Sequence, residues 1–269
     1  MDTIIQILAR ELGRSEAHVE NVVRLIDEGN TIPFIARYRK ELHGAMDDTA
    51  LRTLADRLQY LRNLDKRREE VKSAIEGQGK LTEELSAAID AAATLAEVED
   101  LYRPYRQKRR TRATVAREKG LEPLAELLFA QAADGPAPEE AAGAFIDPEK
   151  GVETAEDALQ GASDIIAERI SDDADIRKRL RELVWKKGYL VSAAAAKEPE
   201  DTVYRLYYAF RSPLNRVQGH QVLAINRGER EGVLKVSVEM EREAALIPVR
   251  RAVLNPGAPA MAFVRAAAE

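Results

Sequence analysis

The residues with the clearest chemical potential form a basic segment, which runs from Leu101 to Arg117 and holds no acidic residue. An arginine guanidinium presents parallel N–H donors to a phosphate or a carboxylate, and a threonine hydroxyl can contact a phosphodiester backbone. The candidate contacts for nucleic acid are Arg103, Arg106, Lys108, Arg109, Arg110, Thr111, Arg112 and Arg117. This density of cations without interleaved acids predicts a bound anion, either a nucleic-acid backbone or an acidic protein surface.

The same segment has a purely structural interpretation. The chain carries 46 acidic residues, so a loop rich in arginine could pair with carboxylates of its own fold. Thr111 and Thr114 could likewise serve local structure instead of a ligand. Both interpretations stay open at the level of sequence.

A second, smaller basic cluster follows Pro33 and forms a secondary candidate for nucleic-acid contact: Arg37, Arg39 and Lys40. Phe34 and Tyr38 lie four residues apart, which is the spacing of one helix face, and we expect both rings to pack inward. That packing would leave the three cations as a solvated face, and for this cluster we favour the solvated face over a binding role.

The residue types needed for catalysis or metal binding do not form a convincing pattern. There is no cysteine, no glycine-rich phosphate loop, and the three histidines lie far apart: His18, His43 and His220. Two acidic groups could bind a metal in principle: Glu97, Glu99 and Asp100, and Asp172, Asp173 and Asp175. We expect the first to compensate helix ends or the basic segment, and the second to cap a helix. The sequence therefore predicts no enzyme, no metal site and no cofactor.

Composition limits the class of protein. The 269 residues carry a net charge of −5, so nucleic acid is not expected to coat the whole surface, although a local basic patch can act alone. No apolar run approaches the roughly 20 residues that span a membrane. The first residues lack a signal peptide's basic start and apolar core, and we expect a cytoplasmic protein with no membrane partner.

Apolar spacing predicts the elements that must position the basic segment. The fold is expected to be mainly α, with a long helix from Asp48 to Glu76 whose middle, with Lys66-Arg67-Arg68 and two glutamates, is a solvated surface. A small β element is expected near 189–195 and 233–240, and apolar and polar residues alternate from Leu234 to Met240 in the second of these stretches. The aromatic-rich stretch 203–210 is expected to be helical, and the end after Asn255 resembles a cut.

Five stretches of the chain resemble the Tex family of bacterial transcription accessory proteins, in order and across nearly the whole length. They are TIPFIARYRKE (31–41), LRTLADRLQYLRNLDKRREEVKSAIEGQGKLTEEL (51–85), TLAEVEDLYRPYRQKRRTRATVAREKGLEPLAELL (94–128), ALQGASDIIAERISDDADIR (158–177) and GHQVLAINRGEREGVLKV (219–236). The family's basic loop carries over as Tyr102, Pro104, Tyr105, Lys108, Arg109, Arg110, Thr111 and Arg112. The sequence departs from the family at Gln218–Gln221, where relatives often have Pro-Ser-His-Arg.

The resemblance implies a helix-turn-helix-like domain over 65–130, inserted in a discontinuous helical domain formed by 1–64 and 131–269. It also implies that the family's ribonuclease-H-like, helix-hairpin-helix and S1 domains would follow this region. The implied function is a non-catalytic scaffold in transcription regulation, with RNA or DNA, the transcription machinery, or both as partners. An interdomain docking module without nucleic-acid affinity is the alternative.

Overall fold

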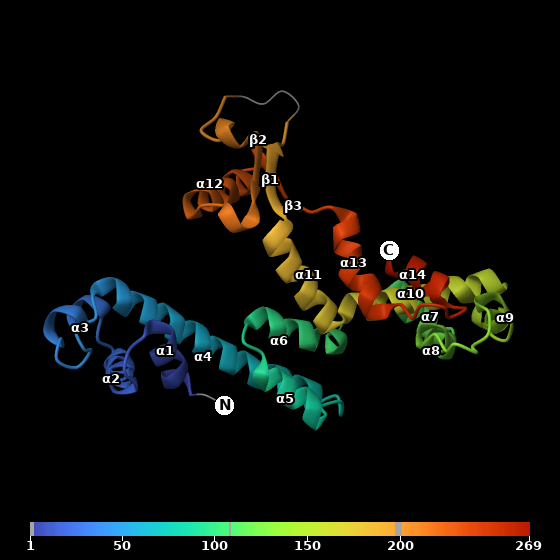
Figure 1. The fold of residues 1–269 in the computed structure, drawn as a ribbon, viewed down its shortest axis with the longest axis horizontal. Helices are drawn as coiled ribbons and strands as arrows, with labels where there is room; N and C mark the ends of the chain where they lie inside the picture. The colour runs from blue at the N-terminus through green and yellow to red at the C-terminus, as the bar shows by residue number, and fades with distance from the viewer. Residues whose placement is uncertain (1–2, 108, 197–200) are drawn as a thin grey trace. The chain divides into compact units, whose positions relative to one another are not determined.

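The computed structural model describes residues 3–107, 109–196 and 201–269. The chain divides into two compact units, Met1–Tyr105 and Arg106–Glu269. The described residues are mainly helical with one small antiparallel sheet, which confirms the expected fold class (Figure 1). The division into a domain over 65–130 and a discontinuous domain around it stays a prediction. No helix of the described ranges has the length and apolarity needed to cross a bilayer.

The first unit is organised around one long helix, α4 (Asp48–Glu76). The other helices of this unit are α1 (Ile4–Leu12), α2 (Glu16–Asp27), α3 (Ile32–Tyr38), α5 (Glu83–Ala91) and α6 (Leu95–Tyr102). Figure 1 shows α1, α2 and α3 beside the first half of α4, and α5 and α6 beside its second half. The buried stripe of α4 is Leu51, Leu54, Leu58, Leu61, Leu64, Val71 and Ile75.

Helix α4 begins and ends where the sequence predicts. The Asp47 side chain caps it by accepting a hydrogen bond of 2.7 Å from the amide of Ala50, and Gly77 follows its last residue. The expected solvated middle is wrong for Arg68, whose side chain is only 14% exposed. Helices α5 and α6 pack beside it, and Arg68 Nη2 donates to the Ala92 carbonyl at 2.7 Å.

The second unit is organised around α10 (Ala155–Asp172). Its other helices are α7 (Arg112–Glu118), α8 (Glu122–Ala130), α9 (Pro138–Gly143), α11 (Ala174–Lys187), α12 (Gly219–Arg230), α13 (Arg242–Val253) and α14 (Met261–Ala268). Small residues bring α7 close to α10. A Cβ at Gly161 would overlap the Leu121 Cδ1 methyl and lie 3.2 Å from Ala116 Cβ. Leu121 is fully buried and cannot move aside, so this approach depends on glycine.

A polar clasp joins the end of α8 to the segment after α13. Gln131 is buried, and its backbone has a positive φ of 47°. Its side chain donates to the Val253 carbonyl at 2.7 Å and accepts from the Asn255 amide at 3.0 Å. The Asn255 side chain donates back to the Gln131 carbonyl at 3.0 Å. The amide nitrogen and the amide oxygen of Gln131 are therefore both hydrogen-bonded, to residues 122 and 124 positions later in the chain.

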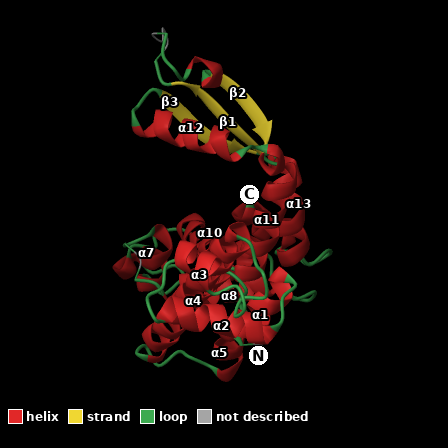
Figure 2. Ribbon diagram, turned by 90° about the vertical axis from the view of Figure 1, so that its left-hand side faces the viewer, coloured by secondary structure: helices red, strands yellow, loops and turns green. Residues whose placement is uncertain are grey.

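The sheet has the order β2-β1-β3, with β1 (Tyr189–Ala194) antiparallel to both β2 (Ala209–Pro213) and β3 (Leu234–Glu239). Helix α12 packs against one face (Figure 2), where a Cβ at Gly228 would lie only 2.7 Å from Leu234 Cδ1. Strands β1 and β3 confirm the expected β element.

The prediction of a helix over 203–210 is wrong. A 3-10 turn, Arg205–Tyr207, leads directly into strand β2. Phe210 pairs with Ser192 of β1, and the Ser192 hydroxyl donates to the Tyr207 carbonyl at 2.6 Å. Aromatic side chains suit a strand once a partner strand is present, and tertiary pairing here overrides the helical spacing.

Candidate nucleic-acid interface

The basic segment begins at the end of α6, passes through a 3-10 turn (Arg103–Tyr105), and ends in α7. The Thr111 hydroxyl starts α7 by accepting a hydrogen bond of 3.1 Å from the amide of Thr114. This is an ordinary N-cap, and it places Arg112 in the first turn. Arginine opposes the helix dipole at that position, so local helix stability does not account for its presence.

One carboxylate of α10 holds two of the predicted contact residues. Glu168 accepts from the Thr111 hydroxyl at 3.0 Å and from Arg117 Nη1 at 2.6 Å, and its own side chain is only 15% exposed. Partial burial by itself lowers the pKa of the Arg117 guanidinium, but the hydrogen bond and charge of Glu168 outweigh burial and raise it. Thr111 and Arg117 therefore fasten α7 to α10.

The remaining cations of the loop differ from these two by their exposure. Arg110 binds Glu118 at 2.7 Å, but the two side chains are 70% and 53% exposed. Arg112 lies 3.4 Å from Asp164 and is 85% exposed. Arg109 is exposed and makes no hydrogen bond or ion pair with a described residue. Exposed ion pairs are worth about 0–1 kcal/mol, so an incoming phosphate can displace Glu118 from Arg110 at little cost. The Asp164 side chain is only 14% exposed, but the exposed Arg112 guanidinium leaves room for a phosphate beside it.

Three further predicted contacts complete the segment. Arg106 is exposed and Arg103 is half-buried, and each already interacts within the fold. Lys108 lies outside the described residues. The exposed cations of the described loop are thus Arg106, Arg109, Arg110 and Arg112.

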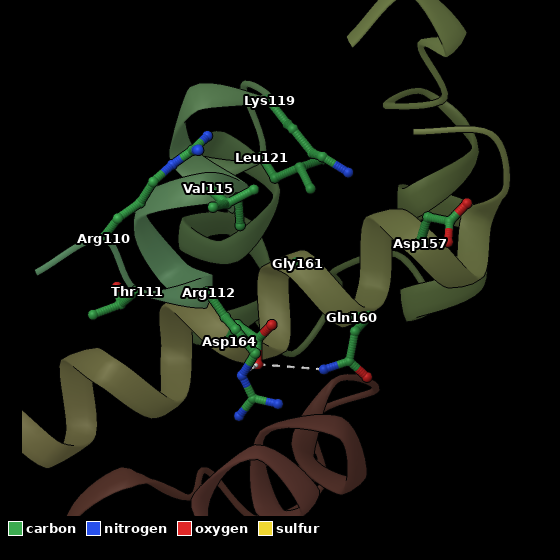
Figure 3. Close-up of a pocket in the computed structure, with 11 residues that line it drawn as sticks. Arg110, Thr111, Arg112, Val115, Lys119, Leu121, Asp157, Gln160, Gly161 and Asp164 are labelled. Atoms are coloured by element: carbon green, nitrogen blue, oxygen red, sulfur yellow. Dashed lines mark hydrogen bonds and ion pairs between the residues drawn. The ribbon is translucent and has the colours of Figure 1, made fainter. Parts of the chain in front are cut away.

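A groove of about 420 Å³ beside these arginines is lined by residues of both α7 and α10 (Figure 3). Arg110 and Lys119 flank α7, whereas Asp157 and Asp164 stand on α10. Lys119 is occupied, because its Nζ donates to the Gly151 carbonyl at 2.7 Å. The mixed charge of the groove favours an anion at its arginine rim over one deep inside it.

The secondary cluster lies at the end of α3 and contradicts one expectation. Tyr38 is 56% exposed and does not pack inward, because Ile35 takes the buried position of this short helix. The ring of Phe34 lies 5.2 Å from that of Tyr38, and the Arg39 guanidinium lies 5.3 Å from the Phe34 centroid. Arg37 and Lys40 are exposed and form no ion pair with a described residue.

The two acidic groups serve the ends of helices and ion pairs. Glu97 accepts from the Ala93 amide at 2.7 Å, Glu99 binds Arg67 at 2.6 Å, and Asp173 caps α11 by accepting from the Ile176 amide at 2.8 Å. Within the described ranges, no three His, Asp or Glu side chains are placed to hold a metal.

Sequence reasoning missed a second basic surface, on α11. Six cations lie within 177–187 against the single acid Glu182, and Trp185 in the same stretch is 60% exposed. The charge density was visible in the sequence. The exposure of the tryptophan was not, because apolar residues of a helix ordinarily mark its buried face.

Comparison with known proteins gives two family matches. Residues 2–76 match the Tex-like protein N-terminal domain, and residues 134–262 match the Tex central region-like family. The basic segment lies between the two matched ranges.

The chain is also similar to longer curated proteins. It is 46% identical over 241 residues to "Protein tex" of Bordetella pertussis, covering 89% of this chain and 30% of that protein. It is 40% identical to "Transcriptional accessory protein Tex" of Neisseria gonorrhoeae, covering 88% and 31%. It is 32% identical to "S1 RNA-binding domain-containing protein 1" of Homo sapiens, covering 88% and 24%. The chain spans about a third or less of the length of these relatives.

Proposed function

The chain belongs to the Tex family, of which it holds the N-terminal and central regions. From this premise we propose that it is a non-catalytic, cytoplasmic scaffold that acts in transcription regulation. We propose that it contributes an auxiliary contact to nucleic acid. The contact is formed by the exposed arginines before and at the start of α7. A primary contact would come from an S1 domain, and a ribonuclease-H-like and a helix-hairpin-helix domain would also follow in the full-length protein.

The observation that carries this proposal is the exposure of Arg109, Arg110 and Arg112. Such cations bind phosphates by releasing condensed counterions, which gives a sequence-independent affinity. Arg109 has no ion pair with a described residue, Arg110 has an exposed partner, and Arg112 stays 85% exposed although the Asp164 carboxylate beside it is largely buried.

Interdomain docking is the second candidate function. The ion pairs that the arginines of the loop already form with carboxylates favour it. Arg110 already binds the Glu118 carboxylate at the end of α7, and the groove beside it is lined by both basic and acidic side chains. An acidic surface of a downstream domain, or of the transcription machinery, would meet the same side chains.

The test is salt-dependent binding of this chain to RNA and DNA, single- and double-stranded. The triple variant Arg109→Glu, Arg110→Glu, Arg112→Glu is expected to abolish the loop contact, which is measured as a large loss of affinity at moderate salt. At low salt, the slope of log K against log salt should flatten by about 2 to 3 for three lost phosphate contacts.

A charge-matched control uses three exposed cations from other surfaces: Arg14→Glu, Lys80→Glu and Lys235→Glu. This control variant should retain the affinity of the loop contact, apart from a small loss caused by the change in net charge. Equal losses in both triple variants would contradict a localised contact. No binding by the wild-type chain, together with binding to the remainder of a full-length relative, would favour the docking function.

A further inference from the structure

The exposed side of α11 combines cations with a large aromatic ring. Lys178, Arg181 and Trp185 recur at three- and four-residue spacing and lie on one stripe of the helix. All three side chains are exposed, and the opposite side of the helix buries Ile176 in the core of the second unit. The folding of α11 therefore does not depend on the exposed stripe.

Two basic hollows lie beside this stripe. Residues of α8, α10, α11 and α13 line the first, of about 460 Å³, and residues of α11 and α13 line the second, of about 410 Å³. Arg179 and Arg251 line both hollows, Arg169 lines the first, and Lys186 and Lys187 line the second. The acids that line the two hollows are fewer: Asp173, Asp175 and Glu182.

Several of these charges are available to a ligand. Arg179, Lys186 and Lys187 are exposed and make no ion pair with a described residue, whereas the Asp173 carboxylate is engaged in capping α11. A partner that meets this surface must therefore be an anion. Because the Trp185 ring is exposed on the same helix, the anion must also offer an apolar face that can cover this ring.

Single-stranded nucleic acid combines these two properties. Its phosphates pair with cations, and its unpaired bases expose faces that stack on aromatic side chains without sequence preference. A duplex keeps its base faces stacked on one another, so Trp185 could not reach them. An acidic protein segment would satisfy the cations, but it would need an aromatic side chain at the right position to stack on the indole, whereas every base of a single strand carries a π-face.

We propose that the exposed face of α11 binds single-stranded nucleic acid, with a base stacked on Trp185 and the phosphates on Arg179, Lys186 and the neighbouring cations of α11. The proposal adds a second contact and a preferred strand class to the nucleic-acid function proposed above. The α11 proposal depends only on residues of α11, so it and the proposal of a loop contact can fail separately.

Trp185 is the only tryptophan of the chain, which makes intrinsic fluorescence a local probe of this site. Titration with 12-nucleotide oligo(dT) and oligo(U) is expected to quench the emission, and a 12-base-pair duplex at the same phosphate concentration is expected to leave it nearly unchanged. Poly-glutamate serves as the polyanion without bases. Quenching by poly-glutamate equal to that by the oligonucleotides would overturn the proposal in favour of protein docking.

Two variants test the roles separately. Trp185→Ala, followed by anisotropy of a labelled oligonucleotide, is expected to weaken binding roughly 5-fold or more, and Trp185→Phe is expected to keep most of it. Arg179→Glu with Lys186→Glu should remove the quench, whereas Arg14→Glu with Lys80→Glu, which makes the same charge change elsewhere, should keep it. Circular dichroism checks that each variant is folded.

The triple loop variant separates this proposal from the preceding one. If the quench persists in that variant, the α11 contact is independent of the loop. If the loop substitutions remove all binding and the quench together, or if Trp185→Ala binds like the wild type, the α11 proposal fails while the loop contact stands. A quench that survives with no loss of affinity in the loop variant leaves α11 standing and removes the loop contact.

Discussion

Two cation-rich stretches, one in each unit, have different surroundings. On α4, Arg67 binds Glu99 at 2.6 Å and Glu70 at 3.0 Å, and Arg68 binds Asp65 and the Ala92 carbonyl. Their side chains are 29% and 14% exposed. In the loop before α7, by contrast, Arg110 and Arg112 are 70% and 85% exposed.

The difference comes from the elements that pack on each stretch. Helix α6 supplies the Glu99 carboxylate to the middle of α4, and Ala92, directly after α5, supplies a carbonyl. The hydrogen bond that Arg67 donates to Glu99 raises the pKa of Arg67 despite partial burial. In the loop before α7, the carboxylates of α10 reach Thr111, Arg117 and Arg112, but Arg112 stays 85% exposed, and Arg109 has no ion pair with a described residue. A basic residue becomes structural when packed acceptors enclose it, and it stays available to a ligand when its side chain remains exposed.

The largest expected effect is a loss of stability when the packing of α7 against α10 is disrupted. Helix α7 carries the end of the basic segment. Gly161→Val would drive a side chain into Leu121 and Ala116 and should destabilise the second unit by about 2–3 kcal/mol. Thermal unfolding and hydrogen exchange of α7 and α10 measure it. Gly143→Val is the matched control, because nothing lies within 4 Å of a Cβ there. Equal effects of both substitutions would show that close packing does not hold α7.

A smaller loss of stability is expected when one cation is removed, and its size should differ between α4 and the loop before α7. Arg68→Ala leaves the part-buried Ala92 carbonyl without its donor and should cost about 1–2 kcal/mol of unfolding free energy. Arg109→Ala removes an exposed side chain and should change stability by less than about 0.5 kcal/mol. Urea denaturation of both variants gives the comparison, and a cost at Arg109 equal to that at Arg68 would refute the distinction between the stretches.

The smallest effect concerns pH. Arg57 forms two hydrogen bonds of 2.7 Å with Glu11, and the hydrogen bond from Arg57 lowers the pKa of that carboxyl below its ordinary 4.5. A lowered folded-state pKa stabilises the fold above the unfolded-state pKa, and this gain is lost as the pH falls through the folded value. Because the Glu11 side chain is 38% exposed, solvent screening keeps the pair below about 1 kcal/mol.

Arg57→Gln should therefore be less stable than the wild type at pH 7, and the difference should shrink as the pH falls below 4.5. Denaturation midpoints from pH 7 to pH 3 measure it. Arg109→Gln, which loses no described carboxylate partner, is the control and should track the wild type at every pH. A constant deficit for Arg57→Gln would mean that the pair does not act through the charge of Glu11.

Local signals in the sequence predicted the elements whose boundaries they determine. Asp47 and Gly77 delimit α4, and the strict alternation in 234–239 identifies β3. Strand β2 was missed because its stability comes from pairing with β1, which is a non-local contact. In the same way the sequence identified the cations of the loop but not their partners, since Glu168 lies 51 residues beyond Arg117.

The clasp at Gln131 has a consequence for the order of folding. The first unit has all of its core by Tyr105, so it can fold while the rest of the chain is still being synthesised. The second unit cannot satisfy the buried Gln131 side chain until Val253 and Asn255 leave the ribosome. Until then, the surface of α10 that receives α14 is open to solvent, and the nascent second unit exposes apolar residues of its core for longer than the first unit does.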